Sequence, residues 1–345
     1  MTNIVQSIGY SLGKLHTGFF AYLCDIYREG EREPLEAVLE TLGVPVPAIP
    51  TPAREWNSID LAILDGQERR PRILIEMKVD DHEHETTRVI NGVRKKGYQT
   101  DLYAEAFPEC DAYLYVTLGL GEYFHAPYGH RFRWVRLRDF LGALDRIAAP
   151  NHFVEQWRDA LRNELDIRER VFHLDRSRLW ECRAGAWNIY FLGRLKEELL
   201  QSLGHNSLDI DPTCYTYGTR PDTILNFGWS REPEYMEINN NGRLNLKLSF
   251  DNRADAATRE GAVREAMRKV VQSYASGSYR LHETGRVGAS KTVASFDIGL
   301  VDEQECLRFA GTKEDSVRKV ETILRVFYGR HGNNSLHIGG GGVRV

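Results

Sequence analysis

Residues 56–78 contain two apolar segments that are separated by a polar linker. Apolar side chains occupy 73–75 and all of 59–64 except Asp60, and the linker between these two runs contains Asp65-Gly66 and Pro71. Short apolar runs bounded by turn residues are typical of β-strands. This stretch therefore predicts a β-hairpin, and the rest of the first half is organised around it.

The same pattern predicts the neighbouring elements. Apolar residues at helical spacing over 12–42, with a polar break at 28–31, predict two packed helices. The proline-rich segment 45–52 predicts a stiff, extended connector. After the hairpin we expect an acidic helix start at 80–85, a helix over about Thr86–Phe107, a strand over 111–118, a strand with one basic face over 131–138, and a helix beginning at Asp139.

The second half predicts α+β structure. A helix over 151–170 with a single apolar row fits a bridge to a second unit or a dimer contact. We then expect helices at about 186–203, 254–274 and 315–328, and strands at about 223–229, 235–238, 244–250 and 293–300, with Asn241-Gly242 as a hairpin turn. No catalytic motif stands out there, so target recognition, ligand sensing and dimerisation all stay open.

Three ionisable residues interrupt the apolar strands of the hairpin. Glu76 and Lys78 are two residues apart on one strand, so they project from the same face, and Asp60 on the neighbouring strand can reach that face. An exposed Glu-x-Lys is more often a solvated ion pair. The apolar run before Glu76 predicts a buried strand instead, where an unpaired charge is costly.

Two carboxylates at one point can hold a metal ion. Asp60, Glu76 and the carbonyl of Met77 supply the hard oxygen ligands that Mg²⁺ prefers, and Mn²⁺ can substitute. The metal would lower the pKa of a bound water and shield charge that builds up on phosphorus. Lys78 could hold or deprotonate that water, or meet the developing charge as a point cation.

The order Asp60, fifteen residues, Glu76-x-Lys78 resembles the PD-(D/E)XK nuclease superfamily, whose metal-dependent members cut phosphodiester bonds in DNA. The resemblance implies that these three residues are catalytic and that the two acids bind the metal. Ile59 stands in place of the proline of the family's motif, at a position that is often not proline in the family. The implied fold is a mixed α/β, restriction-endonuclease-like core with helices on both sides of the sheet, followed here by a C-terminal α+β domain.

Gln99 and Tyr103 extend the resemblance. They are four apart in a predicted helix and resemble the QxxxY element of exonuclease-like branches, which implies that they line the site and position nucleic acid. A Gln and a Tyr on one helix face are otherwise commonplace. The helical lead-in resembles one branch in which a helix glutamate completes the metal site, and Glu36 and Glu40 are the candidates, although both facing water is the commoner outcome.

Basic residues cluster just before Gln99. Arg88, Arg94, Lys95 and Lys96 could contact a phosphate backbone, with Lys95 and Lys96 as substrate-binding residues, or could form a solvated face. The net charge of −4 argues against non-specific wrapping of long DNA but leaves room for a local basic surface.

Length and composition add limits. The 345 residues suffice for two domains, and 42% apolar and 27% charged residues are typical of a globular protein. Five scattered cysteines predict neither a disulfide framework nor a zinc site. Without an apolar run of membrane-spanning length or a secretion signal, we expect a cytoplasmic protein that does not contact membranes.

The expected organisation is a nuclease-like catalytic domain over 1–150, a bridging helix over 151–180, an α+β domain over 181–330 and a flexible glycine-rich tail over 331–345. The leading hypothesis is a Mg²⁺-dependent nuclease acting on DNA, in a branch linked to defence against phage or mobile DNA. The alternative is a catalytically silent nuclease-fold module that binds nucleic acid or a protein partner. Oligomeric state stays open, although a duplex-cutting enzyme with one site per chain favours a homodimer.

Overall fold

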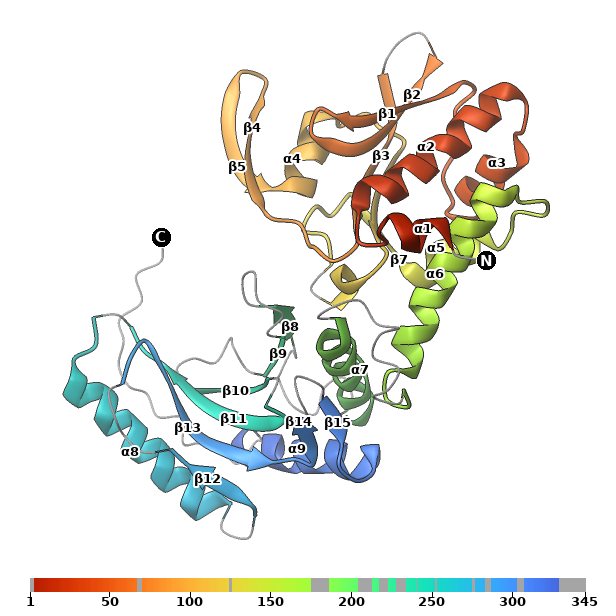
Figure 1. The fold of residues 1–345 in the computed structure, drawn as a ribbon. Helices are drawn as coiled ribbons and strands as arrows, with labels where there is room; N and C mark the ends of the chain where they lie inside the picture. Colours follow the sequence, from red (N-terminus) through yellow and green to blue (C-terminus); the bar gives the residue numbers. More distant parts are fainter. Residues whose placement is uncertain are drawn as a thin grey trace. The chain divides into compact units, whose positions relative to one another are not determined.

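The computed structural model describes residues 3–66, 70–123, 126–174, 186–203, 213–216, 223–227, 234–239, 241–251, 253–274, 277–282, 287–302 and 307–328. The chain divides into two compact units, Met1–Tyr190 and Phe191–Val345 (Figure 1). Among the described residues, no helix is long and apolar enough to cross a membrane. The glycine-rich tail expected over 331–345 lies outside the described residues.

A five-stranded mixed sheet forms the centre of the first unit. Its strands are β1 (Pro50–Trp56), β2 (Ile59–Asp65), β3 (Arg70–Lys78), β6 (Ala112–Thr117) and β7 (Arg133–Arg136), in the order β1-β2-β3-β6-β7. The first three are antiparallel, while β3 pairs with β6, and β6 with β7, in parallel. The predicted hairpin is confirmed as β2 and β3.

Helices cover both faces of this sheet, so the unit is mixed α/β as predicted (Figure 1). On one face, α2 (Gly13–Glu29), α3 (Glu33–Thr41), α5 (Leu137–Leu144) and α6 (His152–Arg170) bury residues in the larger core, together with Ile73, Ile75 and Met77 of β3. On the other face, α4 (Gln99–Ala106) packs Tyr103 in a smaller core with Leu74 and Tyr115.

Helix α6 packs within the first unit. Its Trp157 is fully buried and donates a hydrogen bond from Nε1 to Nδ1 of His16 on α2, 3.0 Å away. The short helix α1 (Ile4–Ile8) is held against α6 by Asn3, which donates to the carbonyl of Gln156 at 2.7 Å. The apolar row that predicted a bridging helix therefore covers this core.

The helix expected over Thr86–Phe107 is wrong in its first half. Residues Glu85–Ile90 (β4) and Val93–Tyr98 (β5) form an antiparallel hairpin, and α4 begins only at Gln99. Asn91 and Gly92 both have positive φ, 51° and 78°, as a two-residue hairpin turn requires. The acidic helix start expected at 80–85 is also wrong, because that segment runs without a helix into β4.

Strand β1 was missed because its prolines conceal it. Pro50 and Pro52 belong to a segment that reads as an extended connector, but β1 lies at the sheet edge, where a missing N–H is tolerated. It turns into β2 through Asn57 and Ser58, whose φ angles are 50° and 63°.

The second unit combines helices with a six-stranded antiparallel sheet, in agreement with the predicted α+β character. The sheet order is β12 (Tyr279–Leu281), β13 (Ser290–Asp297), β11 (Arg243–Ser249), β10 (Glu234–Ile238), β9 (Thr223–Phe227) and β8 (Thr213–Thr216). The remaining elements are α7 (Ala186–Leu203), which contains the boundary between the units, α8 (Ala256–Ser273), α9 (Lys313–Tyr328) and the pair β14 (Leu300–Asp302) and β15 (Leu307–Phe309).

Candidate active site

Strand β3 carries two of the predicted site residues on one face. Ile73, Ile75 and Met77 point into the larger core, and Leu74 points into the smaller core beneath α4. Since successive side chains of a strand alternate, Glu76 and Lys78 lie on the α4 face of the sheet. This part of β3 is buried because the apolar residues before Glu76 pack into the two cores.

Strand β2 brings Asp60 to the same point. The register pairs Leu61 with Ile75, so an antiparallel neighbour places Asp60 level with Glu76. The backbone N–H of Met77 donates to Oδ2 of Asp60 at 2.8 Å. This bond fixes one oxygen of Asp60 against β3, and the structure thus brings together the three residues that the sequence singled out.

Glu76 and Lys78 form a buried ion pair. Nζ of Lys78 lies 2.9 Å from Oε1 of Glu76, and the two side chains are 9% and 1% exposed. The second oxygen, Oε2 of Glu76, is buried and has no hydrogen-bond partner within the described part of the chain. An unpartnered buried carboxylate oxygen is costly, so this atom marks a position where a cation or a donor group would be stabilised.

The two carboxyl groups have raised pKa values. Burial raises the pKa of Glu76 to about 7, and the Asp60 carboxylate adds to the rise while Lys78 opposes it. Burial also raises the pKa of Asp60, against the Met77 hydrogen bond and Lys78, which lower it. Burial opposes the charge on Lys78, but Glu76, Asp60 and Asp81 outweigh it, so the pKa of Lys78 is raised.

Helix α4 places Gln99 and Tyr103 over this face. Gln99 is the first residue of the helix, and its Nε2 donates to the hydroxyl of Tyr103 at 3.4 Å. That hydroxyl donates to the carbonyl of Ser58 at 2.6 Å, directly before β2. Burial, followed by the charge of Glu76, raises the pKa of Tyr103.

Glu83 is a buried carboxylate that the sequence did not single out. It accepts hydrogen bonds from the backbone N–H and hydroxyl of Thr100, at 3.0 and 2.6 Å, and from the N–H of Tyr128. Its own N–H donates to the hydroxyl of Tyr115 at 3.1 Å. It therefore holds the segment after β3 to the start of α4. Nothing in its acidic run distinguishes it, because its partners lie far away in the chain.

Two glycines fix the backbone that follows Lys78. A Cβ added to Gly119 would lie 2.7 Å from the carbonyl oxygen of Val79, and one added to Gly121 would lie 2.5 Å from that of Asp81. Both distances are too short for any side chain, so the 3₁₀ turn over Leu120–Tyr123 packs directly on this backbone.

The other predicted site residues lie elsewhere or have other partners. Glu36 is on α3, whose buried side chains pack in the larger core on the opposite face of the sheet from Glu76. The structure does not bring it to the site. Lys95 pairs with Glu105 of α4, and Lys96 lies 2.7 Å from Glu85.

Of the side chains predicted to bind a metal ion, only Asp60 and Glu76 lie at the site. The carbonyl of Met77 lies close to the first turn of α2, since a Cβ on Gly13 would be 3.6 Å from it. Within the described residues, no group of three or more His, Cys, Asp or Glu side chains is arranged to hold a metal ion. The site thus offers two carboxylates, Asp60 and Glu76, with backbone carbonyl and water left to complete any coordination shell.

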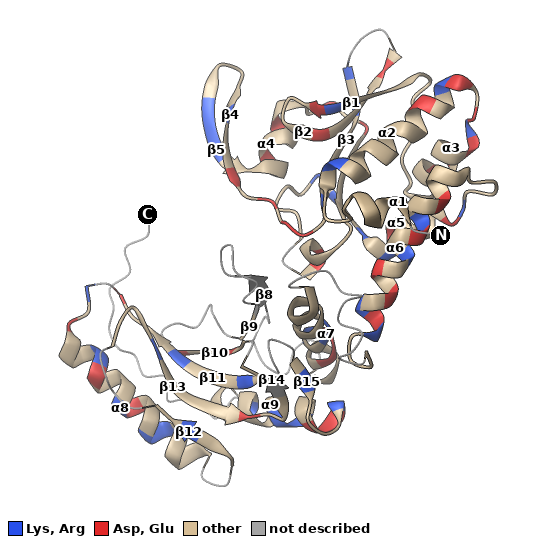
Figure 2. Cartoon of the chain, in the orientation of Figure 1, with Lys and Arg blue, Asp and Glu red and all other residues tan. Residues whose placement is uncertain are grey.

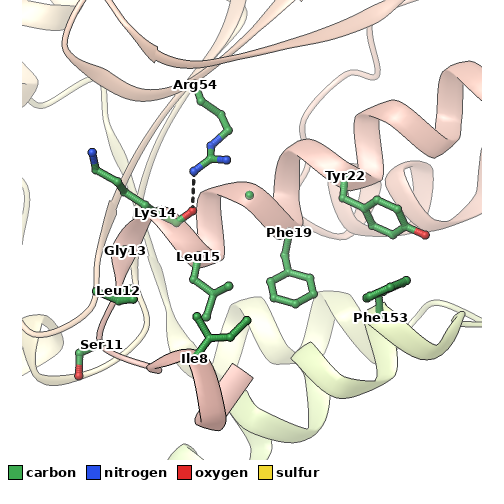
Figure 3. Close-up of a pocket in the computed structure, with 11 residues that line it drawn as sticks. Ile8, Ser11, Leu12, Gly13, Lys14, Leu15, Phe19, Tyr22, Arg54 and Phe153 are labelled. Atoms are coloured by element: carbon green, nitrogen blue, oxygen red, sulfur yellow. Dashed lines mark hydrogen bonds between the residues drawn. The ribbon is translucent and has the colours of Figure 1, made fainter. Parts of the chain in front are cut away.

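A cavity of about 760 Å³ lies elsewhere in the first unit. It is lined by Ile8, Leu12, Phe19, Tyr22 and Phe153, with Arg54 at one side donating to the carbonyl of Lys14 at 2.9 Å (Figure 3). None of Asp60, Glu76 and Lys78 lines it. Its apolar walls offer little to a phosphate, so it is distinct from the candidate active site.

Comparison of the chain with family models, curated proteins and solved structures finds no match in any of the three.

Proposed function

We propose that this chain is a metal-dependent nuclease that hydrolyses phosphodiester bonds in DNA. The observation that carries the proposal is the buried group formed by Asp60, Glu76 and Lys78 on one sheet face, with Oε2 of Glu76 left without a partner in the described part of the chain. The Asp60 carboxylate raises the pKa of Glu76, and the single ammonium group of Lys78 offsets only one of the two buried negative charges.

The surrounding fold also supports the proposal of a nuclease. The group lies where the sheet changes from antiparallel pairing at β2 to parallel pairing at β6, between helices on both faces. A mixed sheet with helices on both faces agrees with what the resemblance to the PD-(D/E)XK superfamily implies, and it supports the proposal.

The residues present fit Mg²⁺, or Mn²⁺ in its place. Oε2 of Glu76, the free oxygen of Asp60 and the Met77 carbonyl are hard oxygen donors, and such a partial set leaves positions for water and a phosphate oxygen. When bound, the metal supplies an activated water and charge compensation at phosphorus. The unpartnered oxygen of Glu76 is the specific atom that such an ion would satisfy.

Lys78 acts as a cation in this proposal. Its raised pKa keeps the ammonium group protonated at neutral pH, which disfavours the alternative role as a base. Held at 2.9 Å from Glu76, the ammonium can donate to the attacking water or to a phosphate oxygen. Of the roles that the sequence left open, the structure favours those that need a positive charge.

Gln99 and Tyr103 are positioning residues here. The hydroxyl of Tyr103 binds the carbonyl of Ser58, two residues before Asp60, and thereby ties α4 to the strand that carries the carboxylate. Gln99 sits at the start of α4 and accepts from the N–H of His84 at 3.4 Å. The pair would keep the wall of the site at a fixed distance from β2.

The silent-module alternative has one observation in its favour. Within the described residues, no third acidic or imidazole side chain is arranged with Asp60 and Glu76 to hold a metal ion, because one oxygen of Glu76 is occupied by Lys78 and no further ligand joins the two acids. In that alternative, the three residues form only a buried ion network.

Cleavage assays separate the two functions. Plasmid, linear duplex and single-stranded DNA are incubated with Mg²⁺ or Mn²⁺ and with the native chain, Asp60→Asn or Asp65→Asn, the last being a matched control at the far end of β2. We expect the native chain and the control to cut and Asp60→Asn to be inactive. Cleavage that survives in Asp60→Asn overturns the assigned site, and a native chain that cuts none of these substrates favours the silent module.

A further inference from the structure

The β4–β5 hairpin stands apart from the two main sheets. Its strands form a two-stranded sheet of their own, and Figure 1 shows it extending beside α4. Over residues 85–98 it has four basic residues (Arg88, Arg94, Lys95, Lys96) and one acidic residue, Glu85, which gives a net charge of +3 in a chain of net charge −4. Figure 2 shows this positive charge on the hairpin.

One face of the hairpin contacts α4. The register pairs Arg88 with Lys95, which places both side chains on the same face. The guanidinium of Arg88 lies 5.3 Å from the ring centre of Tyr103 and donates to the carbonyl of Asn57 at 2.8 Å, while Lys95 pairs with Glu105 of α4. These two basic residues anchor the hairpin to the helix that lines the candidate active site.

The opposite face is available to a partner. It carries Val89 and Arg94, which pair with each other, and Lys96. Arg94 is exposed and forms no ion pair within the described part of the chain, and the pair of Lys96 with Glu85 is solvent-exposed and thus weak. Two cations on a face directed away from α4 contribute little to holding the hairpin in place.

The tip of the hairpin is apolar and exposed. Val89, on the face of Arg94, and Val93, on the face of Arg88 and Lys95, flank the Asn91-Gly92 turn and are 66% and 57% exposed. Exposed apolar side chains beside cations are suited to a surface that is both charged and apolar. The grooves of DNA are such a surface, because phosphates line their edges and the thymine methyl lies in the major groove.

We propose that the β4–β5 hairpin is an arm whose tip enters a groove of duplex DNA, with Arg94 and Lys96 on the phosphates and the two exposed valines of the tip, Val89 and Val93, against base edges. A two-stranded ribbon fits the width of the major groove. Duplex is favoured over single-stranded DNA because single strands bind through exposed aromatic rings. The one aromatic residue of the hairpin, Tyr98, is stacked on Tyr128, with ring centres 3.6 Å apart. This inference rests on the proposed function.

The arm is tested by binding, without cleavage. Fluorescence anisotropy with a short labelled duplex, and with one of its strands alone, is recorded over a range of salt concentrations in EDTA. The variants are Arg94→Ala/Lys96→Ala, Val89→Thr/Val93→Thr, and Arg28→Ala/Arg138→Ala as a control that removes two exposed cations from α2 and α5. Threonine keeps the branched shape that suits a strand.

Each variant has its own expected result. The hairpin charge variant should bind duplex more weakly and reduce the slope of log affinity against log salt by about 2, since each phosphate contact contributes about 0.9. The valine variant should weaken duplex binding several-fold with the slope unchanged. The control should match the native chain, and single-strand binding should change little in all variants.

The outcomes separate this inference from the proposed function. If the hairpin variants bind duplex as the native chain does, or if duplex and single strand weaken equally, the duplex arm is overturned whether or not the chain cuts DNA. If the native chain binds no duplex DNA, the arm is overturned as well. If the salt slope falls as expected but the native chain never cuts, the arm stands and the nuclease proposal fails.

Discussion

Among the described residues, a Glu–Lys pair with a buried glutamate lies on a sheet face in each unit. In the first unit, Lys78 lies 2.9 Å from Glu76; in the second, Lys247 lies 3.1 Å from Glu237. The glutamate side chains are 1% and 4% exposed. Residue types, separation and burial of the glutamate are nearly the same, yet we propose only the first pair as part of an active site.

The neighbours of each pair make the difference. Glu76 faces a second carboxylate, Asp60, at the point where the sheet changes from antiparallel to parallel pairing. Glu237 lies in the interior of an antiparallel sheet, where the register places the neutral side chains of Asn226 and Asn245 beside it. A buried ion pair alone is therefore weak evidence for a catalytic site. A second carboxylate facing the pair, together with a carboxylate oxygen that has no partner, is stronger evidence.

The largest expected contrast is in activity and metal binding. The Glu76→Gln variant should cut DNA at least about a thousandfold more slowly than the native chain. It should also lose the Mn²⁺ binding measured by electron paramagnetic resonance, because a neutral amide replaces a charged metal ligand. Glu237→Gln should change neither. Equal losses in the two variants would show that the assays report folding and would remove the distinction between the pairs.

The next contrast is in stability. Lys78→Met leaves two buried carboxylates without a cation and should lower the free energy of unfolding by about 3 to 5 kcal/mol. Lys247→Met should cost less, because Lys247 is 20% exposed and leaves a single carboxylate behind. Urea denaturation of both variants measures the two costs. A larger loss in Lys247→Met would contradict the proposed difference in environment.

A smaller effect should appear in the pH dependence of the metal-free protein. The folded pKa of Glu76, about 7, lies above its ordinary value of 4.5, so the folded state binds more protons between these values. The free energy of unfolding should therefore fall by about 3 kcal/mol as pH rises from about 4.5 to 7, at 1.36 kcal/mol per pKa unit.

Comparison with Glu76→Gln isolates this contribution from that of Asp60, whose raised pKa acts in the same direction. Urea denaturation of native chain and variant at several pH values supplies the measurement. The variant should lose less stability than the native chain over this pH range. Parallel curves for the two proteins would mean that Glu76 titrates normally in the fold.

The smallest effect concerns the second unit. Asn226 is buried, and both polar atoms of its amide lack a hydrogen-bond partner within the described residues. Asn226→Leu should raise the free energy of unfolding by about 1 to 2 kcal/mol, because it removes an unsatisfied polar group.

Asn245→Leu provides the matched comparison for Asn226→Leu. The side-chain oxygen of Asn245 accepts a hydrogen bond from the hydroxyl of Ser295, so this substitution should lower stability. Thermal denaturation distinguishes the two. If Asn226→Leu also destabilises the protein, the amide has a role in the second unit that its contacts do not reveal.

The sequence was most informative where an element is buried. The apolar run before Glu76 predicted a buried strand, and the spacing of Glu76 and Lys78 then predicted a shared face. Gln99 and Tyr103 were likewise predicted from helical spacing and do lie on one helix, joined by a hydrogen bond. In both cases local periodicity carried the information.

The misses come from elements that periodicity describes poorly. The β4–β5 hairpin is largely polar, and its signal was the Asn91-Gly92 turn rather than alternation. Glu83 could not be identified because its partners, Thr100 and Tyr128, are distant in sequence. Glu36 was proposed by analogy of position, and only the packing of α3 shows that it lies across the sheet from Glu76.

The pairing of β3 with β6 affects the order in which the first unit folds during synthesis. Strands β1 to β3 follow one another through short connections, whereas Ile73 pairs with Ala112, 39 positions later. Closing the longer loop costs more chain entropy, so we expect this pairing to form after the local hairpins. A growing chain thus carries Asp60, Glu76 and Lys78 on the ribosome before α4 and β6 bury them. The three charges remain hydrated until then, so the cost of burying them arises only when the long-range pairing of β3 with β6 forms.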